Sequence, residues 1–327
     1  MRPDTIVQLL LLEDPIALLS GLALGLLLDL AYPYHKGIAL KLHPVHTCYV
    51  YSKRLYRPYA SRLHGIVNTV SCIVIHLAIL VILLFASLRP GWPYQLISTA
   101  LVAGVTVKLS ISIRLLFTEA RRTGEALAKG ELEEARRIVS GLVRRDTRSL
   151  GQGHIASAAI EALAESLVDG ITSPLLYYFA SGPTGSLLQR LANTLDGSLG
   201  FKDPELVEQG WFPAKLDTIL NYIPARITGL LILLSGKGPR GLRKALVDLR
   251  RQAGLLESRN AGWPIAAMAL SLGVKLEKRN HYIVGLGELP SPDHVARALA
   301  VARRTVIIYL VIVISLYILL AHAVGWF

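Results

Sequence analysis

The chain has 327 residues, of which 52% are hydrophobic and 18% charged, and its formal net charge is +12. A mean hydropathy of +0.46 is more apolar than that of soluble globular proteins, so the composition argues against a soluble enzyme and favours a multi-pass membrane protein. The basic residues are divided among loops at the edges of apolar segments rather than gathered on one domain, which argues against a nucleic-acid partner.

Apolar segments of membrane-spanning length recur along the chain. Residues 65–88, for example, contain no Asp, Glu, Lys or Arg. As a helix, about 20 such residues cross about 30 Å of hydrocarbon. We predict spans near residues 15–33, 65–88, 93–117, 160–180, 218–235 and 304–327, with helical loops near 34–64, 118–152 and 236–303. All of these segments are assigned to a single integral-membrane domain, 1–327.

The placement of basic residues orients the predicted spans. Residues 36–62 hold six Lys or Arg, 121–148 hold eight, and 237–259 hold seven. Loops rich in Lys and Arg stay on the cytoplasmic side of a membrane. These three loops, and an active site that opens toward them, are therefore predicted to face the cytoplasm, with the N-terminus outside the cell membrane.

No strand-like alternation persists in the sequence, so the chain is predicted to be helical throughout, with turns at Gly and Pro clusters. Residues 155–235 combine carboxylates with Gly and Pro, which favours broken or tilted helices, and such backbone is tolerated at membrane depth only beside protein or water. The predicted fold is an all-α polytopic helical membrane protein. Its broken or re-entrant helices surround an acidic site, and its cytoplasmic loops are helical.

Three carboxylates mark the predicted site, because Glu161, Glu165 and Asp169 recur every fourth residue inside an apolar segment. Each step of four residues exceeds one full turn of an α-helix by only ~40°, so the three side chains lie in one stripe along the helix. Asp169, beside Ile171 and Leu175, is expected to lie deepest, where a charge needs a partner or a cavity. Such carboxylates can hold Mg²⁺, although a solvated acidic helix face is the alternative.

Further polar residues follow this stripe. Asp196 precedes glycines at a predicted helix end, so it serves either the site or a local cap. Asp217 and Asn221 are spaced to share one face of a helix that Pro224 breaks. Arg226 is a poor lipid-facing residue, so it is expected to pair either with an acid inside the bundle or with an anionic ligand.

Two other motifs are candidates for phosphate or substrate binding. Arg145 and Asp146 lie in a basic cluster that can neutralise phosphate oxygens, although membrane topology alone also explains basic residues there. Asn260 and Trp263 belong to a predicted tight turn, whose alternative role is to anchor a loop. There is no GxxxxGK[ST] loop, and residues 151–156 imitate a dinucleotide-binding turn without the strand that such a turn follows.

In their order and spacing, these motifs resemble the adenosylcobinamide-phosphate synthase family of cobalamin biosynthesis, CobD/CbiB. The resemblance covers nearly the whole chain, and its specificity comes from the order of the motifs. The matching residues are Leu28-Asp29, His43-Pro44-Val45, Arg145-Asp146-Thr147, 159–166, Asp169-Gly170, Pro174-Leu175, Asn193-Thr194-Leu195-Asp196, Gly200-Phe201, Lys215-Leu216-Asp217, 221–226, 260–264 and 267–269.

The chain departs from the family pattern at three positions. Thr218 stands where a second aspartate is usual, Ser166 where Asn is common, and Arg259 where Pro is common. Because Mg²⁺ needs few protein ligands, Asp217 without a second aspartate is expected to suffice.

The resemblance implies a ligase that forms a C–N (amide) bond with ATP and Mg²⁺. It would join the propionate carboxylate of adenosylcobyric acid to (R)-1-amino-2-propanol phosphate, or to aminopropanol, giving adenosylcobinamide phosphate or adenosylcobinamide. A carboxylate reacts poorly with an amine, so ATP would first convert it to an acyl phosphate. Mg²⁺ at Glu161, Glu165 or Asp169 would neutralise the phosphate charge.

Within the region that the resemblance identifies, individual roles are hypotheses. Arg145, Lys215 and Arg226 are candidate phosphate partners, and Asp196 or Asp217 would accept a proton from the attacking ammonium. The full catalytic set is Glu161, Glu165, Asp169, Asp196 and Asp217. The substrate- and phosphate-binding set is Arg145, Asp146, Asn193, Lys215, Asn221, Arg226, Asn260 and Trp263.

The expected partners are the corrinoid and aminopropanol substrates and membrane lipid, with a homo-oligomer or an association with other cobalamin-pathway enzymes as further options. Two other functions are alternatives. An intramembrane Mg²⁺-dependent phospho- or prenyltransferase would need a dense Asp motif, but the next acid after Asp169 is Asp196. A cation-coupled transporter would favour internal repeats with matching broken helices, and no repeat is apparent.

Overall fold

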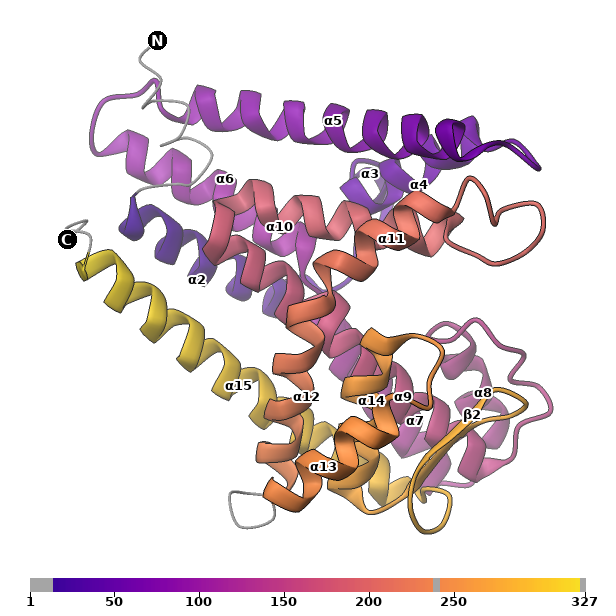
Figure 1. Cartoon of the computed structure of the whole chain (residues 1–327). Helices are drawn as coiled ribbons and strands as arrows, with labels where there is room; N and C mark the ends of the chain where they lie inside the picture. Colours follow the sequence, from indigo (N-terminus) through magenta and orange to yellow (C-terminus); the bar gives the residue numbers. More distant parts are fainter. Residues whose placement is uncertain (1–13, 238–241, 324–327) are drawn as a thin grey trace. The chain divides into compact units, whose positions relative to one another are not determined.

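A computed structural model of the chain describes residues 14–237 and 242–323. These residues are mostly helical, as predicted, and belong to two compact units that interleave along the chain (Figure 1). Unit 1 comprises Met1–Ile113, Ser173–Leu220 and Val313–Phe327, and unit 2 comprises Arg114–Thr172 and Asn221–Ile312. The single domain expected from the sequence stays a prediction.

Unit 1 is built from helices, and α15 contributes its last residues to it. Its helices are α2 (Pro15–Ala31), α3 (Gly37–Lys41), α4 (Pro44–Leu55), α5 (Arg62–Ser87), α6 (Tyr94–Ser110), α10 (Ser173–Leu199) and α11 (Trp211–Leu220). Unit 2 holds α7 (Ile113–Ala128), α8 (Leu132–Ser140), α9 (Gln152–Leu167), the π-helix η1 (Val168–Thr172), α12 (Tyr222–Lys237), α13 (Leu242–Ala253), α14 (Arg259–Leu272), β1 (Lys275–Lys278), β2 (Tyr282–Gly285) and most of α15 (Pro292–Ala323).

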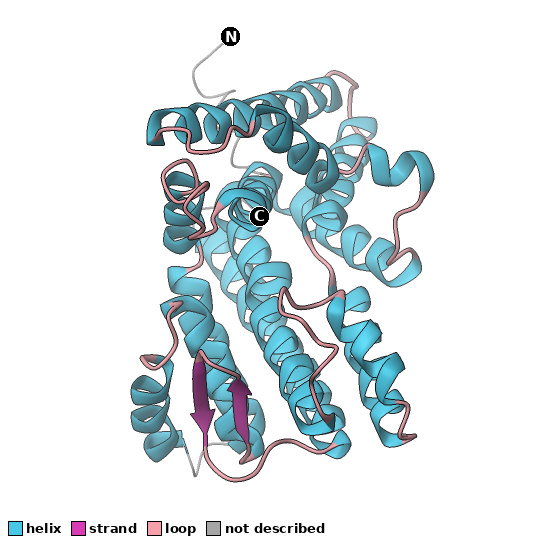
Figure 2. Ribbon diagram, turned by 90° about the vertical axis from the view of Figure 1, so that its right-hand side faces the viewer, coloured by secondary structure: helices cyan, strands magenta, loops and turns pink. Residues whose placement is uncertain are grey.

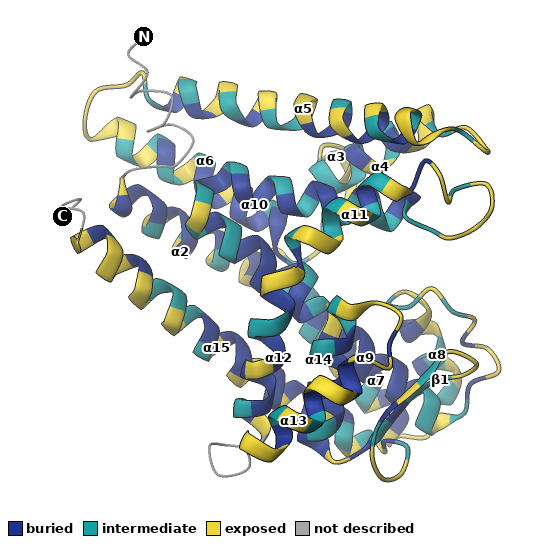
Figure 3. Ribbon diagram, in the orientation of Figure 1, coloured by how far each residue is buried: buried dark blue, intermediate teal, exposed yellow. Residues whose placement is uncertain are grey.

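The protein is a polytopic helical membrane protein. In the described part of the chain, three helical stretches are long and apolar enough to cross a membrane: α5, α6 continued by α7 (Tyr94–Ala128), and α15. The bent pair α11 and α12 raises the number to four if it counts as one span, and α2 is a shorter apolar helix. Large aliphatic side chains on α5 and α15 are exposed, for example Ile82 at 66% and Leu319 at 67%, and Figure 3 shows exposed residues along both helices. The predicted span at 160–180 is not among these helices.

Close helix packing organises unit 1. A buried cluster from α4, α5 and α10 includes Cys48, Cys72 and Leu191. Helices α2 and α6 approach so closely that a Cβ added at Gly25 would lie 2.5 Å from a methyl carbon of Val107. Small residues that let backbones approach are typical of helix association in membranes.

A buried ion pair also joins α2 to α6. The Lys108 ammonium donates to Asp29 Oδ1 at 3.1 Å, and the two side chains are only 8% and 1% exposed. Both charges are removed from water, so each depends on the other to offset its desolvation.

Replacing Lys108 alone is expected to destabilise the protein strongly. Lys108→Met removes the ammonium that compensates the buried Asp29 charge, at a cost of about 3–5 kcal/mol. The double variant Lys108→Met/Asp29→Leu should recover most of that loss, because neither charge is then buried. Thermal unfolding in detergent checks both variants, and equal midpoints for the single and double variants would contradict the coupling.

His43 caps helix α4. Its Nδ1 accepts a hydrogen bond from the Val45 N–H at 3.2 Å, which requires an unprotonated nitrogen. Burial lowers the pKa of His43 from 6.5 to about 3. Nearby positive or titratable groups add to the shift: His35, Arg190, Lys108 and His46.

Acid is therefore expected to destabilise the protein through His43. The folded pKa is depressed, so as pH falls from about 6.5 toward about 3 the unfolded chain binds a proton that the native state does not. His43→Asn keeps a capping acceptor but does not titrate. Its unfolding temperature should fall less than that of the wild type between pH 7 and pH 5. An equal fall would show that His43 does not contribute.

Unit 2 is organised around α9, whose residues from Ile155 to Ala164 are all buried. Strands β1 and β2 form a two-stranded antiparallel hairpin (Figure 2). One face of α9 packs on this hairpin, in which Lys275 pairs with Gly285 and Lys278 with Tyr282. The prediction of helix throughout is wrong here. Each strand has only four residues, too few for an alternating pattern to be recognised, and stability comes from packing on α9.

The helix break near Pro224 lies earlier than predicted. Helix α11 ends at Leu220 and α12 begins at Tyr222, with a bend of 48° between them. Proline has no N–H and clashes with the carbonyl four residues before it, so the break falls at Leu220. The Leu220 carbonyl instead accepts a hydrogen bond from the Tyr177 hydroxyl at 2.9 Å. Asn221 consequently lies outside the helix that carries Asp217.

Candidate functional site

Glu161 is the most deeply buried carboxylate of the predicted site, at 5% exposure. It accepts hydrogen bonds from Ser157 Oγ at 2.6 Å, the Tyr282 hydroxyl at 2.7 Å and an Arg145 Nη2 at 3.2 Å. Burial and the Glu161 charge raise the pKa of Tyr282, so the phenol stays a donor. We call these four residues the Glu161 network. It ties α9 to strand β2 and to the segment that carries Arg145.

The three carboxylates of the stripe lie in different surroundings. Glu161 is buried, Glu165 is exposed, and Asp169 is half-buried. The expectation that Asp169 lies deepest is therefore wrong, because Glu161 is covered by residues distant in the sequence. Asp169 also lies in the π-helix η1, where the chain no longer turns by 100° per residue. Short π-helices inside α-helices are frequent at functional sites.

Asp169 and Asn221, two predicted site residues, are in contact. Asn221 Nδ2 donates to Asp169 Oδ1 at 3.1 Å, and Asn221 is 1% exposed. Hydrogen bonds also fix the π-helix that carries Asp169: Thr172 Oγ1 and Thr228 Oγ1 lie 2.7 Å apart, and the Tyr309 hydroxyl donates to the Thr172 carbonyl at 2.7 Å. The start of α12 is thereby held against η1.

Arg226 gathers two more of the predicted residues. Its Nη1 donates to Asn260 Oδ1 and to the Tyr222 carbonyl, both at 2.7 Å. Its guanidinium lies 3.6 Å from the centre of the Tyr222 ring and 5.5 Å from that of Trp263. Of the two expected partners, an acid inside the bundle is absent among the described residues, so neutral groups hold this charge. A cation positioned in this way can still bind an anion.

Close backbone packing makes the Arg226 arrangement possible. A Cβ added at Gly229 on α12 would lie 3.1 Å from the Trp263 carbonyl oxygen of α14. The two helices therefore meet beside Trp263, which brings Arg226 and Asn260 within hydrogen-bonding distance.

Four of the predicted residues belong to unit 1: Asn193, Asp196, Lys215 and Asp217. Asn193 Nδ2 donates to Asp217 Oδ1 at 3.3 Å, so these two predicted residues are brought together by α10 and α11. Lys215 is exposed on α11, and Asp196 is half-buried on α10. We call these four predicted residues the unit 1 group.

The stripe can serve Mg²⁺ only with few protein ligands. In residues 14–237 and 242–323, no group of three or more His, Cys, Asp or Glu side chains is arranged to hold a metal ion. Mg²⁺ usually takes one or two carboxylates and completes its shell with water and substrate phosphate. Glu165 and Asp169 offer the oxygen donors that this ion prefers, whereas Glu161 already accepts three hydrogen bonds.

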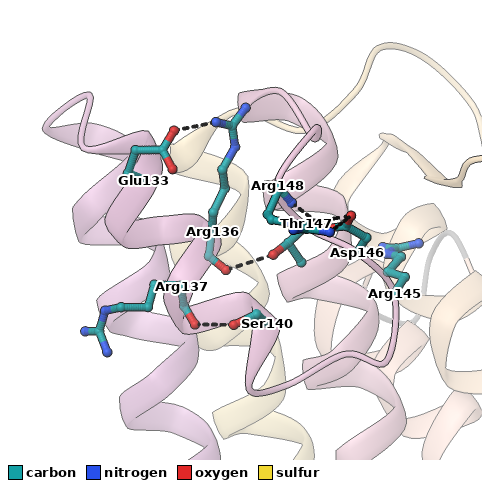
Figure 4. A pocket seen from close by; sticks show the side chains of 8 residues that line it. All are labelled: Glu133, Arg136, Arg137, Ser140, Arg145, Asp146, Thr147 and Arg148. Atoms are coloured by element: carbon teal, nitrogen blue, oxygen red, sulfur yellow. Dashed lines mark hydrogen bonds and ion pairs between the residues drawn. The ribbon is translucent and has the colours of Figure 1, made fainter.

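Two basic pockets of unit 2 share Arg145 and Asp146. One, of about 380 Å³, is lined by Arg136, Arg137 and Arg148 as well (Figure 4). The other, of about 300 Å³, is lined by His154 and by residues 277–281 of the hairpin. The sequence predicted Arg145 and Asp146 but not Tyr282 or the hairpin, because these are brought to the site by tertiary contacts alone. Ser157 was also missed, although it lies one helical turn before Glu161 on α9.

The fold and these groups define a membrane protein whose polar site combines carboxylates, amides and arginines. A family model described as CobD/Cbib protein matches residues 22–315. The chain is 49% identical over 288 residues to the probable cobalamin biosynthesis protein CobD of Aeropyrum pernix, covering 86% of this chain and 87% of that relative. The chain belongs to the CobD/CbiB family, which confirms the resemblance seen in its motifs.

Other relatives carry the same name. Identity is 36% over 276 residues to the probable cobalamin biosynthesis protein CobD of Thermoplasma acidophilum, covering 83% of this chain and 89% of the relative. Identity to the probable cobalamin biosynthesis protein CobD of Pyrococcus furiosus is 35% over 297 residues, covering 89% of this chain and 96% of the relative. No solved structure matches the chain.

Removing the Tyr282 hydroxyl is expected to loosen the hairpin. Tyr282→Phe deletes one donor to the buried Glu161 carboxylate, and a hydrogen bond to a charged group contributes about 1.5–3 kcal/mol. Hydrogen–deuterium exchange of residues 275–285 should be faster than in the wild type. The exposed Tyr49→Phe is the control and should leave this exchange unchanged. Unchanged exchange in Tyr282→Phe would show that the Glu161 network does not hold the hairpin.

Proposed function

We propose that this protein acts in cobalamin biosynthesis as an ATP-dependent amide ligase. It would join adenosylcobyric acid to (R)-1-amino-2-propanol phosphate, or to aminopropanol. The observation that carries the proposal is the gathering in unit 2 of residues that the family resemblance selects from distant segments: Asp169 with Asn221, and Arg226 with Asn260 and Trp263. Membership of a family whose relatives are named for cobalamin biosynthesis supports the pathway.

The reaction needs groups that bind anions. Transfer of the terminal phosphoryl group of ATP to the substrate carboxylate gives an acyl phosphate and ADP. The amine then attacks the acyl carbon, and phosphate and a proton leave. Arg226, held by neutral partners, keeps its charge for an anionic group of the substrate, and Arg145 borders two basic pockets. Both arginines reduce the repulsion between negatively charged reactants.

Glu165 and Asp169 are the proposed magnesium ligands. When bound, Mg²⁺ neutralises phosphate charge in the transition state. The Asn221 amide orients the Asp169 carboxylate by donating to one of its oxygens. An amide that donates to a metal-binding carboxylate is typical of the surroundings of such sites. The Glu161 network is assigned a positioning role, because its carboxylate is buried and already has three donors.

The unit 1 group is proposed to serve the amine. Asp217, oriented by Asn193, or Asp196 would accept the proton that the ammonium must lose before it can attack. Lys215 is exposed and is a candidate partner for a phosphate on the amine.

The proposed location is the cell membrane, with the site open to the cytoplasm and the N-terminus outside. The placement of Lys and Arg in the sequence supports this orientation. ATP is a cytoplasmic substrate, so the orientation and the reaction agree. The family membership favours the ligase over the transferase and transporter alternatives.

The proposal predicts ADP release that depends on both organic substrates. Purified protein in detergent should release ADP when given adenosylcobyric acid, aminopropanol phosphate and Mg²⁺, and should form the amide product detected by mass spectrometry. Folded wild-type protein that releases no ADP above background with either amine would refute the ligase assignment.

Substitution of the proposed metal ligands tests whether they set the Mg²⁺ requirement of the reaction. Asp169→Asn should raise the Mg²⁺ concentration for half-maximal activity by at least about tenfold, because loss of even indirect partners of a metal costs that much. Asp248→Asn, on α13 of the same unit, is the matched control and should behave as the wild type. An unchanged Mg²⁺ requirement in Asp169→Asn and in Glu165→Gln would remove both carboxylates from the metal site.

A further inference from the structure

The smaller basic pocket of unit 2 has features that the proposed reaction has not used. It lies between the start of α9 and the turn of the β-hairpin, and its volume is about 300 Å³. We call it the hairpin pocket. Its charged or titratable lining comes from both elements and from the segment before α9: Arg145, Asp146, His154, Glu277, Lys278, Arg279 and His281.

The cations of the hairpin pocket are only partly neutralised. Lys278 has no ion-pair partner among the described residues, and Arg279 Nη2 has only His154 Nδ1 at 3.5 Å. In the described part of the chain, buried Arg145 Nε and His154 Nε2 have no hydrogen-bond partner, although His154 Nε2 lies 3.7 Å from a Glu277 oxygen. Buried donors of this kind are costly unless a ligand or water satisfies them.

The two carboxylates in the wall already have cationic partners. Asp146 accepts from Arg148 at 2.9 Å, and Glu277 lies 3.3 Å from the Lys275 ammonium. Neither Arg148 nor Lys275 lines the hairpin pocket. The acids are therefore neutralised from outside, which leaves the pocket interior positive.

The N-terminus of α9 adds to this positive potential. Gly151 is the N-cap and makes no side-chain cap hydrogen bond, so the first N–H groups of this 16-residue helix lack a side-chain acceptor. Unsatisfied N–H groups and the helix dipole together favour phosphate. The glycine-rich residues 151–156, without a preceding strand, thus begin a helix beside the pocket. The larger pocket differs, because its Arg136 and Arg148 pair with Glu133 and Asp146.

We propose that the hairpin pocket binds the phosphate chain of the nucleotide, with Lys278, Arg279 and Arg145 as its cationic partners. This assignment rests on the proposed function, because it takes ATP as a substrate. Several cations together with a helix N-terminus suit a polyphosphate, which carries several charges along its length. The Glu161 network links this pocket to the stripe, because Glu161 pairs with Arg145 and also holds the hairpin through Tyr282.

Aminopropanol phosphate also carries a phosphate group, so the experiment must distinguish it from the nucleotide as the ligand of the hairpin pocket. Binding of ATP, tripolyphosphate and aminopropanol phosphate to the full-length protein in detergent is measured by isothermal titration. Lys278→Gln/Arg279→Gln removes two charges at the turn but keeps polar side chains. Lys129→Gln/Arg303→Gln removes two exposed charges of unit 2 that line neither pocket. Thermal unfolding confirms that both variants are folded.

We expect the hairpin variant to bind ATP and tripolyphosphate at least about tenfold more weakly, since charge-assisted contacts are the stronger hydrogen bonds, while the control binds as the wild type. Loss of affinity for aminopropanol phosphate alone would overturn the nucleotide assignment. Equal ATP binding by both variants would overturn the site and leave the ligase proposal intact. Weakened ATP binding in the hairpin variant, with a wild type that makes no amide, would support the site and refute the ligase.

Discussion

The buried carboxylate of Glu161 is the interaction on which the architecture of unit 2 depends. A charge that is only 5% exposed is tolerated because three donors surround it, one from its own helix, one from strand β2 and one from Arg145. Two strands of four residues have little stability of their own. The carboxylate thus anchors the hairpin and places Arg145 at the border of both basic pockets.

The two arginines of the site illustrate different ways to hold a cation. Arg145 is paired with the buried Glu161 carboxylate, which holds it at the border of both basic pockets. Arg226 is held by an amide oxygen, a backbone carbonyl and two aromatic rings, none of which carries a negative charge. Such an arrangement fixes the position of a guanidinium without cancelling its charge. It is suited to a ligand that brings the negative charge itself.

The parts of this structure that depend on local sequence could be predicted, and the parts that depend on distant contacts could not. Apolar runs identify α5 and α15 because hydrophobicity is a local property. The residue types at Asp169, Asn221, Arg226 and Asn260 indicated a site, but their pairing arises from the packing of α12 on η1 and α14. The burial of Glu161 could not be predicted, because it depends on residues that are distant in the sequence. Tyr282, for example, lies more than 100 positions away.

The site residues Asp169 and Asn221 lie at or beside the irregular segments of the backbone. The chain passes from one unit to the other at Thr172, where η1 ends, and at Leu220, where α11 ends. Asp169 precedes the first of these points and Asn221 follows the second, and the two side chains are bonded within unit 2. A π-helix and a helix break both sacrifice regular hydrogen bonds. Tyr309 and Tyr177 restore them at the Thr172 and Leu220 carbonyls. The site therefore lies where side chains supplement the hydrogen bonding of the backbone.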